Sequence, residues 1–289
     1  MATLREIRRR ISSVHGTQQI TKAMKMVSSV KLRYAQQAIV AIRPYAYELR
    51  DIIAHLIASS DDLESVSLMT KKEIKNVLLV PISGDRGLCG AFNSNIIRET
   101  VRRIDHYSDY DIALYPVGKK SVEFFSKRYS KIEGSMAGFF NDIELQDGLK
   151  LSRALIDLYE SGKYQKIEII YNEFKSAIQQ NIVMEQFLPF VEDENAEASK
   201  PAIDFIYEPG EEAILNHVIP KHLNIQIWRM LLESNAAEQG ARMTAMDSAT
   251  ENANELISKL TLFYNRTRQA AITKELSEIV GGAEVLNEK

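Results

Sequence analysis

The stretch KHLNIQIWRMLLESNAAEQGARMTAMDSATENANELISKLTLFYNRTRQAAITKELSEIV, residues 221–280, decides the fold. It contains no proline, and its only glycine is Gly240, so nothing in it breaks a helix. At about 1.5 Å of rise per residue, such a helix would be a rod roughly 90 Å long. A compact domain of this size does not need a helix of that length.

Small and apolar residues recur in this rod at steps of three or four, the spacing that keeps one stripe of a helix against a partner helix. Because small residues dominate the first half of the stripe, a second backbone could approach closely there. A helix that folds back into a bundle remains an equal alternative for this stretch alone. The stripe comprises Ala236, Gly240, Met243, Met246, Ala249, Ala253, Leu256, Leu260 and Phe263.

The N-terminal sixty residues carry a matching pattern. Pro44 predicts a bend near Arg43 rather than an end, although a proline inside a helix costs about 3 kcal/mol. Two long helices at opposite ends of the chain are therefore expected to pair antiparallel. The apolar positions are Leu4, Ile7, Ile11 and Val14 and, after a polar patch, Val27, Val30, Tyr34, Ala38, Ala41, Tyr45, Leu49, Ile52 and Leu56.

Short apolar runs between the two helices predict strands. Buried strands are expected at 76–83, 111–117 and 166–174, and edge strands at 182–190 and 204–207. Helical patterns at 94–106, 119–129 and 149–159 separate the first three, which indicates a mostly parallel, Rossmann-like α/β sheet. The sequence thus predicts one discontinuous coiled coil, residues 1–60 and 211–286, with an α/β domain inserted at 73–208. The acidic stretch 191–201 is expected to be an exposed loop.

Composition excludes several classes of protein. The formal net charge of the 289 residues is −3, which argues against a nucleic-acid binder held by bulk charge. The chain contains no run of eighteen apolar residues, so no membrane span is predicted. The single cysteine, Cys89, cannot form an intrachain disulfide, which fits a reducing compartment. A bacterial cytoplasmic setting is the simplest interpretation.

The segment SGDRGLCGAFN, residues 83–93, is the stretch that could carry chemistry. Gly84, Gly87 and Gly90 are three apart, which matches neither G-x-G-x-x-G nor a P-loop, so a structural turn is favoured over a nucleotide pocket. Within this turn, a buried inert thiol at Cys89 is favoured over a nucleophile. The five histidines do not fall at metal-ligand spacings. No catalytic, cofactor or metal site is therefore expected.

Three motifs resemble the gamma subunit of F-type ATP synthase, in the same order and over essentially the whole chain. They are IRRRISSVHGTQQITKAMKMV at 7–27, SGDRGLCGAFN at 83–93, and ARMTAMDSATENANELI with NRTRQAAITKELSEIVGGA at 241–257 and 265–283. The coiled coil with an inserted α/β domain is also the architecture of that family. The rival hypotheses, a nucleotide-binding α/β enzyme and a cytoplasmic coiled-coil scaffold, do not account for the three motifs.

The resemblance implies a non-catalytic rotor shaft. One copy would stand in a ring of three alpha and three beta subunits, with the catalytic sites on beta and with epsilon and the c ring of Fo at its foot. The shaft would transmit torque between proton flow and ATP synthesis or hydrolysis, and would help regulate both. Contact with the membrane would be indirect, through Fo, at the cytoplasmic face of a bacterial plasma membrane. No nucleic acid and no cofactor are expected.

The resemblance also assigns partner contacts, residue by residue. Arg268 and Gln269 match a catch that hydrogen-bonds a beta subunit, and Phe205 and Tyr207 match aromatic foot residues that meet the c ring and epsilon. Family members often have tyrosine where Phe205 stands. A further set matches positions coupled to transmission, with a methionine opposite them on the first helix; these are Arg242, Thr273, Glu275, Glu278 and Met24. An apolar bearing is implied for the tip, at Ile272, Leu276, Ile279 and Val280.

Overall fold

The computed structural model describes residues 3–59, 66–70, 72–140, 142–177, 179–191, 208 and 210–287. By internal contacts the chain divides into two compact units. One unit consists of residues 1–27 and 243–289, and the other of residues 28–242. The predicted strand 204–207 and most of the acidic loop lie outside the described residues.

Two long helices form, as the scarcity of helix breakers predicted. α1 spans Leu4–Ser59 and continues through Pro44, so this proline does not end the helix. A reciprocal cap opens α1, because the Thr3 backbone N–H donates to Glu6 Oε2 and the Glu6 N–H donates to Thr3 Oγ1. α5 spans Glu211–Asn287, 77 residues that include Pro220.

The buried face of α1 differs from the predicted one. Val27, Val30 and Tyr34 are 57%, 53% and 68% exposed. Buried and half-buried positions instead follow one unbroken alternation of three and four residues, through Ile7, Ile11, Val14, Gln18, Thr21, Lys25, Ser28, Leu32, Ala35, Ile39, Ile42, Ala46, Leu49, Ile53 and Leu56. The prediction was wrong because it followed apolar residues past a polar patch, and the misplaced positions are Val27, Val30, Tyr34, Ala41, Tyr45 and Ile52. The helix keeps its period through that patch and buries polar side chains there.

The stripe on α5 needs a similar correction at its far end. Ala236, Gly240, Met246 and Ala253 are buried as predicted, whereas Leu256 and Phe263 are 45% and 51% exposed. From Met246 onward the alternation of three and four runs through Thr250, Ala253, Ile257, Leu260, Tyr264, Thr267 and Ala271. Apolar residues again lie one position beside the buried stripe.

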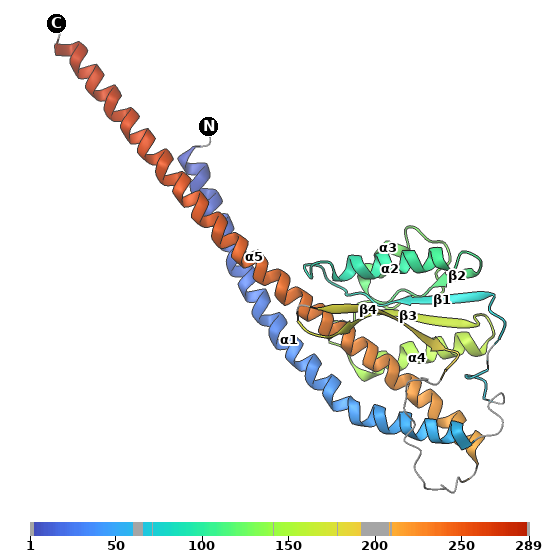
Figure 1. The fold of residues 1–289 in the computed structure, drawn as a ribbon. Helices are drawn as coiled ribbons and strands as arrows, with labels where there is room; N and C mark the ends of the chain where they lie inside the picture. The colour runs from blue at the N-terminus through green and yellow to red at the C-terminus, as the bar shows by residue number, and fades with distance from the viewer. Residues whose placement is uncertain are drawn as a thin grey trace. The chain divides into compact units, whose positions relative to one another are not determined.

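A four-stranded mixed sheet lies between the long helices in sequence, in the order β2-β1-β3-β4 (Figure 1). β1 (Asn76–Pro81) pairs in parallel with β2 (Asp111–Leu114) and with β3 (Lys166–Phe174). β4 (Gln180–Leu188) pairs antiparallel with β3. The first three strands and the edge strand 182–190 therefore form where the sequence predicted them, with shorter β1 and β2.

Helices cover both faces of this sheet. α2 (Phe92–His106) and α3 (Lys119–Phe125) lie over one face, and α4 (Leu145–Glu160) lies over the other (Figure 1). β1 is buried on both sides: Leu78 and Val80 belong to the cluster that contains α4 and α5 residues, while Val77 and Leu79 belong to the cluster that contains Phe125. A strand buried on both faces reads as a continuous apolar run, which is why NVLLVP predicted it.

The larger core joins the sheet to the first half of α5. Its α5 members recur at helical spacing and are Leu215, Ile219, Leu223, Ile227, Met230 and Leu231, all fully buried. At Gly240 the backbone of another element does approach closely, but it is not the partner helix that the small residues predicted. That element is the β3–β4 connection, since a Cβ at Gly240 would lie 3.2 Å from Ala177 Cα.

Candidate functional site

Three polar side-chain pairs link α1 to α5 within the unit formed by residues 1–27 and 243–289. Lys25 Nζ lies 2.5 Å from Asp247 Oδ1, the Thr21 and Thr250 hydroxyls are 2.8 Å apart, and Gln18 Nε2 donates to Asn254 Oδ1. Residue numbers rise on one helix as they fall on the other. The polar patch that interrupted the apolar pattern of α1 is therefore part of the contact between these helices.

This register places Met24 differently from the expectation. Met24 is half-buried and adjoins Lys25, so it lies at the level of Asp247. Thr273 is about 26 residues further along α5, which is roughly 39 Å of helix. Met24 therefore does not lie opposite Thr273, Glu275 and Glu278.

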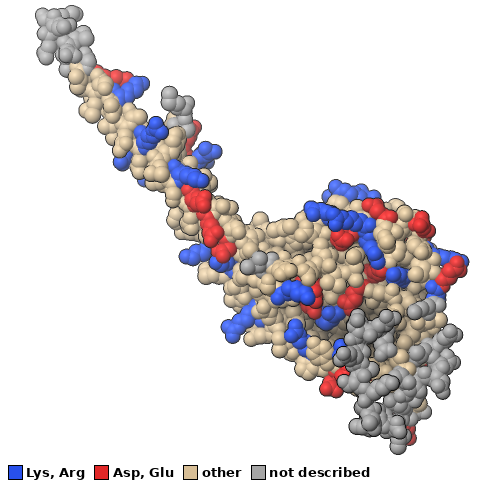
Figure 2. Space-filling model, viewed as in Figure 1, with Lys and Arg blue, Asp and Glu red and all other residues tan. Residues whose placement is uncertain are grey.

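The remaining residues assigned to the far part of α5 are exposed. Arg268, Gln269, Thr273, Glu275 and Glu278 all present their side chains to solvent, and their contacts stay within the helix. Thr273 Oγ1 donates to the Gln269 carbonyl at 2.9 Å, and Lys274 Nζ lies 3.7 Å from Glu278 Oε1. On the face in view, side chains of both charge signs lie along the long helices (Figure 2).

Large apolar side chains are exposed at the same end of α5. Ile272, Leu276 and Ile279 recur at four and three residues, so they share one face of the helix, and they are 49%, 57% and 69% exposed. Val280 beside them is 62% exposed. An exposed apolar stripe of this kind is typical of a surface that another protein covers.

Arg242 is buried, unlike the residues of the tip, whereas Phe205 and Tyr207 lie outside the described residues. The Arg242 side chain is 9% exposed, and its Nη2 lies 2.5 Å from Glu238 Oε1. It also donates to Gln239 Oε1 at 3.2 Å and to the Gly87 carbonyl at 3.3 and 3.4 Å. Arg242 therefore differs in burial from Thr273, Glu275 and Glu278, the exposed residues with which the resemblance grouped it.

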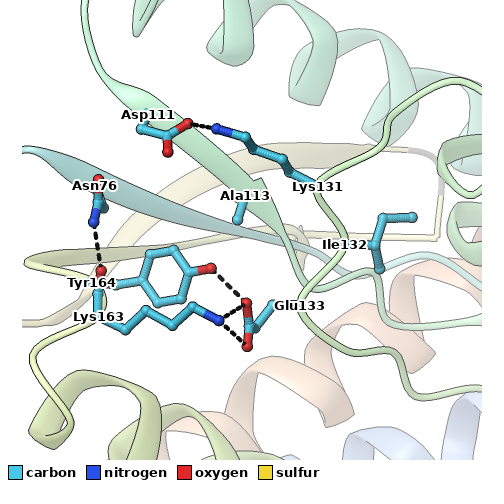
Figure 3. Close-up of a pocket in the computed structure, with 8 residues that line it drawn as sticks. All are labelled: Asn76, Asp111, Ala113, Lys131, Ile132, Glu133, Lys163 and Tyr164. Atoms are coloured by element: carbon cyan, nitrogen blue, oxygen red, sulfur yellow. Dashed lines mark hydrogen bonds and ion pairs between the residues drawn. The ribbon is translucent and has the colours of Figure 1, made fainter.

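A polar hollow of about 250 Å³ lies where β1 and β2 begin (Figure 3). Glu133 at its rim accepts hydrogen bonds from Lys163 Nζ at 2.6 and 2.7 Å and from the Tyr164 hydroxyl at 2.7 Å. The hydrogen bond from Lys163, with that from Tyr164, lowers the pKa of Glu133. Lys131 pairs with Asp111 across the rim. These side chains satisfy one another, and a carboxylate kept ionised in this way is not poised as a general acid or base.

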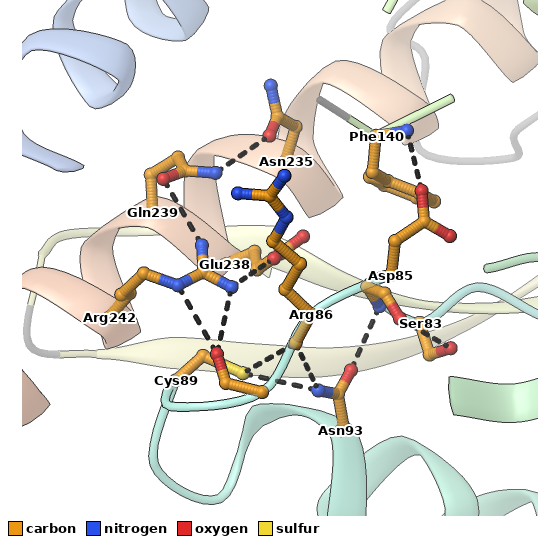
Figure 4. A network of polar contacts seen from close by, with 12 residues as sticks. Ser83, Asp85, Arg86, Cys89, Asn93, Phe140, Asn235, Glu238, Gln239 and Arg242 are labelled. Carbon is orange, nitrogen blue, oxygen red and sulfur yellow. Dashed lines mark hydrogen bonds and ion pairs between the residues drawn. The ribbon is translucent and has the colours of Figure 1, made fainter. Parts of the chain in front are cut away.

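The glycine-rich segment 83–93 is a turn held by hydrogen bonds between side chains and backbone groups (Figure 4). The Asp85 carboxylate accepts three backbone N–H groups, from Lys119 at 2.8 Å, Gly138 at 3.0 Å and Phe140 at 2.9 Å. The Asn93 amide accepts from the Gly84 N–H at 2.9 Å and donates to the Arg86 carbonyl at 3.1 Å. A phosphate cradle needs free backbone amides, whereas here side chains hold the loop in shape. The structural turn is the interpretation that the geometry supports.

Cys89 is buried in this turn, as expected from the sequence. It is 1% exposed, and burial, with the nearby Glu238 carboxylate, raises the pKa of its thiol. A thiol that resists ionisation is a poor nucleophile and a poor metal ligand. Among the described residues no group of three or more His, Cys, Asp or Glu could hold a metal ion, and no helix is long and apolar enough to cross a membrane.

Sequence reasoning missed two ion-pair networks, one around a buried carboxylate and one that is half-buried. Glu168, 3% exposed, is hydrogen-bonded to Arg103 Nε and Nη2 at 2.8 Å and to the Tyr107 hydroxyl at 2.6 Å. Arg229 on α5 pairs with Glu185 on β4 at 2.9 Å. One signal was available: a glutamate inside the apolar strand KIEII must be paired if it is buried.

Comparisons with known proteins match the chain over its whole length. A family model described as ATP synthase matches residues 3–286. The ATP synthase gamma chain of Chloroherpeton thalassium is 47% identical over 302 residues, which cover 100% of this chain and 99% of that one. A chain in the structure of the Tetrahymena thermophila mitochondrial ATP synthase central stalk and c ring is 25% identical, with a TM-score of 0.60, over 80% of this chain and 99% of that one.

A chain in the Euglena gracilis mitochondrial ATP synthase structure, comprising OSCP, F1 and the c ring, has a TM-score of 0.69. At 21% identity over 98% of this chain and 94% of that one, it is evidence for the fold alone. The family follows from the full-length match and the 47% identity, together with the two long helices and the sheet between them. The chain belongs to the family of ATP synthase gamma chains.

Proposed function

We propose that the chain is the central-stalk rotor subunit of an F1Fo ATP synthase. It transmits torque between the proton-driven c ring and the ring of three alpha and three beta subunits. ATP synthesis from ADP and phosphate is thereby coupled to proton transport, and ATP hydrolysis runs the same path in reverse. The chain is not itself catalytic, because in this family the active sites belong to the beta subunits, and it helps regulate both ATPase activity and proton flow.

The far end of α5 is the observation that carries this proposal. Gln18 pairs with Asn254, so at a constant register Leu4, where α1 begins, is level with residue 268. α5 continues to Asn287, which leaves 287 − 268 = 19 residues, roughly 28 Å of helix, beyond α1. Helices in proteins gain most of their stability from packing of an apolar face, and this segment leaves Ile272, Leu276 and Ile279 exposed. A surrounding ring would supply the missing contacts.

We further propose the domain arrangement that the sequence predicted. Residues 1–60 and 211–286 form one discontinuous antiparallel coiled coil, with the α/β domain inserted at 73–208. The opposed numbering of the three pairs from Lys25–Asp247 to Gln18–Asn254 supports the antiparallel direction. The alternation of three and four along both helices supports the coiled coil.

The proposed partners are the alpha and beta subunits, epsilon and the c ring, with one copy of the chain in each complex. Arg268 and Gln269 would hydrogen-bond a beta subunit, and their exposure leaves them available for such a contact. Phe205 and Tyr207 are proposed to meet epsilon and the c ring. The chain is a peripheral subunit of F1, and we place it at the cytoplasmic face of a bacterial plasma membrane, attached through Fo.

A single asymmetric shaft can drive three alike sites only through unequal contacts. Its contact free energy must differ between the conformations of the subunits that it faces, since a shaft that favoured none of them would change nothing on turning. A surface of mixed charge suits this role, because exposed ion pairs contribute little and are released easily. The apolar tip would act as the bearing.

A mild-detergent pull-down of the tagged chain from its own membranes tests the proposal. Native mass spectrometry should find one copy with three alpha and three beta subunits, and the eluate should have ATPase activity that the chain alone lacks. A chain truncated after Asn265 should recover less of the complex or give less torque, because it loses both the catch and the tip. Recovery of the chain alone would refute the rotor function. Hydrolysis of ATP by the isolated chain, or binding of ATP in equilibrium dialysis, would also refute it and would favour a nucleotide-binding enzyme.

A further inference from the structure

A buried ion pair on α5 holds the glycine-rich loop. Glu238 and Arg242 are 3% and 7% exposed and lie four residues apart on the helix. The guanidinium bonds the Glu238 carboxylate at 2.5 Å on one side and the Gly87 carbonyl on the other (Figure 4). A charge so buried is stable only with partners of this kind, and breaking such a pair leaves an uncompensated charge.

Gly84 accommodates the carboxylate of that pair. A Cβ at Gly84 would lie 2.6 Å from both Cδ and Oε2 of Glu238, which is closer than carbon atoms approach without displacement. Glu238 Oε2 is buried and has no hydrogen-bond partner within the part of the chain that the structure describes. The carboxylate is thus packed directly against the backbone of the loop.

The loop cannot move without the elements around it. Asp85, the next residue, binds the backbone N–H groups of Lys119 at the start of α3 and of Gly138 and Phe140 in the following connection. Asn93 ties the Gly84 N–H to the first turn of α2. A displacement of α5 at Glu238 would therefore be transmitted to the end of β1 and to both helices on that face.

We propose that Gly84, Gly87, Glu238 and Arg242 form a rigid joint, here called the loop joint, through which torque passes between α5 and the α/β part of the chain. The proposal rests on the rotor function proposed above and assigns Gly84 and Glu238 as positioning residues for it. It also reassigns Arg242. Since its guanidinium is buried and bound within its own chain, this arginine acts on transmission through the loop joint and not by touching a partner subunit.

The test is the substitution Gly84→Ala in the assembled complex in membrane vesicles, with proton pumping per ATP hydrolysed as the readout. The added methyl should push the Glu238 carboxylate away from Arg242 and lower this ratio by about twofold or more, the range expected of residues that carry coupling between sites. Ala91→Ser is the matched control, because it adds one atom to an exposed residue of the same loop and should leave the ratio unchanged.

A compensating change separates positioning from loss of stability. Glu238→Asp shortens the side chain by one methylene, so Gly84→Ala combined with Glu238→Asp should recover part of the ratio lost by Gly84→Ala alone. If Gly84→Ala prevents assembly, Arg242→Lys replaces it. Lysine keeps the charge but cannot bond Glu238 and Gly87 in the same planar geometry, so the ratio should again fall.

A wild-type ratio in Gly84→Ala, or in Arg242→Lys where Gly84→Ala does not assemble, overturns the loop joint. An equal loss in Ala91→Ser also overturns it, because any change in the loop would then suffice. Failure of the wild-type chain itself to assemble with alpha and beta subunits, or to support pumping, would instead refute the rotor function.

Discussion

Glu168 should make the stability of the fold depend on pH in the acid range. Its carboxylate is buried on β3 and bonded to Arg103, Tyr107 and Lys166, the last with Nζ 2.8 Å from Oε1. Burial alone would raise the pKa of this carboxyl. The hydrogen bonds from the three partners outweigh burial and lower the pKa from 4.5 to about 2.

The sign and size follow from linkage. Because the folded pKa lies below the unfolded one, ionised Glu168 stabilises the fold above pH 4.5, and this contribution is lost as the pH falls through about 2. A pKa lowered from 4.5 to about 2 corresponds to about 3 kcal/mol in the free energy of unfolding at pH 7 and to about 1 kcal/mol at pH 3.

Urea unfolding of the wild-type chain and of Glu168→Gln, at several pH values from 7 to 3, measures this contribution. Glu168→Gln should be less stable by about 3 kcal/mol or more at pH 7, because it leaves Arg103 and Lys166 without their buried counter-charge. The difference from wild type should narrow by about 2 kcal/mol at pH 3. Glu160→Gln, at an exposed residue at the end of α4, is the control. A difference that stays constant from pH 7 to pH 3 would refute the reasoning.

Three further perturbations test the core, the buried thiol and the shaft. Leu155→Ala should cost about 2–5 kcal/mol in urea unfolding, since Leu155 is fully buried, and Leu145→Ala on the same helix, at a residue 45% exposed, should cost much less. Cys89 should react with iodoacetamide at pH 8 far more slowly in the folded chain than in urea, whereas a cysteine introduced as Ser94→Cys, at an exposed position, should react fast in both. Met24→Lys should lower proton pumping per ATP hydrolysed, because it adds a cation beside Lys25, and an unchanged ratio would contradict this.

The long helices and most of the sheet could be predicted because they depend on local properties. Sixty residues without a proline suffice to predict α5, and the apolar run NVLLVP suffices to predict a strand buried on both faces. The existence of these elements needs no knowledge of their neighbours. The bounds of α2, α3 and α4 shifted by a few residues, as helix ends depend on caps and turns.

The buried side of α1 could not be predicted in the same way. Hydrophobicity favours Val27, Val30 and Tyr34, yet the helix buries Ser28 and Thr21. The partner helix decides which face of α1 is buried. Thr250 hydrogen-bonds Thr21 and Asp247 pairs with Lys25, so polar side chains of α1 can face α5 at these positions. A polar residue with a partner is as cheap to bury as an apolar one, and only the structure reveals the partner.

In the candidate site too, local motifs could be predicted from the sequence, whereas contacts between distant residues could not. The sequence motif marked the glycine-rich segment, but the reason for the first of its glycines lies 154 residues away, where Glu238 fills the space that a side chain at Gly84 would occupy. Motif spacing could exclude a P-loop without revealing this contact. Likewise, the sequence grouped Arg242 with Thr273 and Glu278, although one is buried and the others are exposed.

Pro44 shows how a helix can be shaped by a defect on its outer side. It lies on the exposed face of α1, opposite the buried stripe that runs through Ile42 and Ala46. A proline breaks one backbone hydrogen bond and pushes against the preceding turn, so the helix opens on the side of the ring and curves toward the opposite side. Here the opposite side is the one that carries Leu49 and Ile53 into the interior. A bend at Pro44 in this direction would bring the second half of α1 toward the interior, in exchange for the roughly 3 kcal/mol that a proline costs inside a helix.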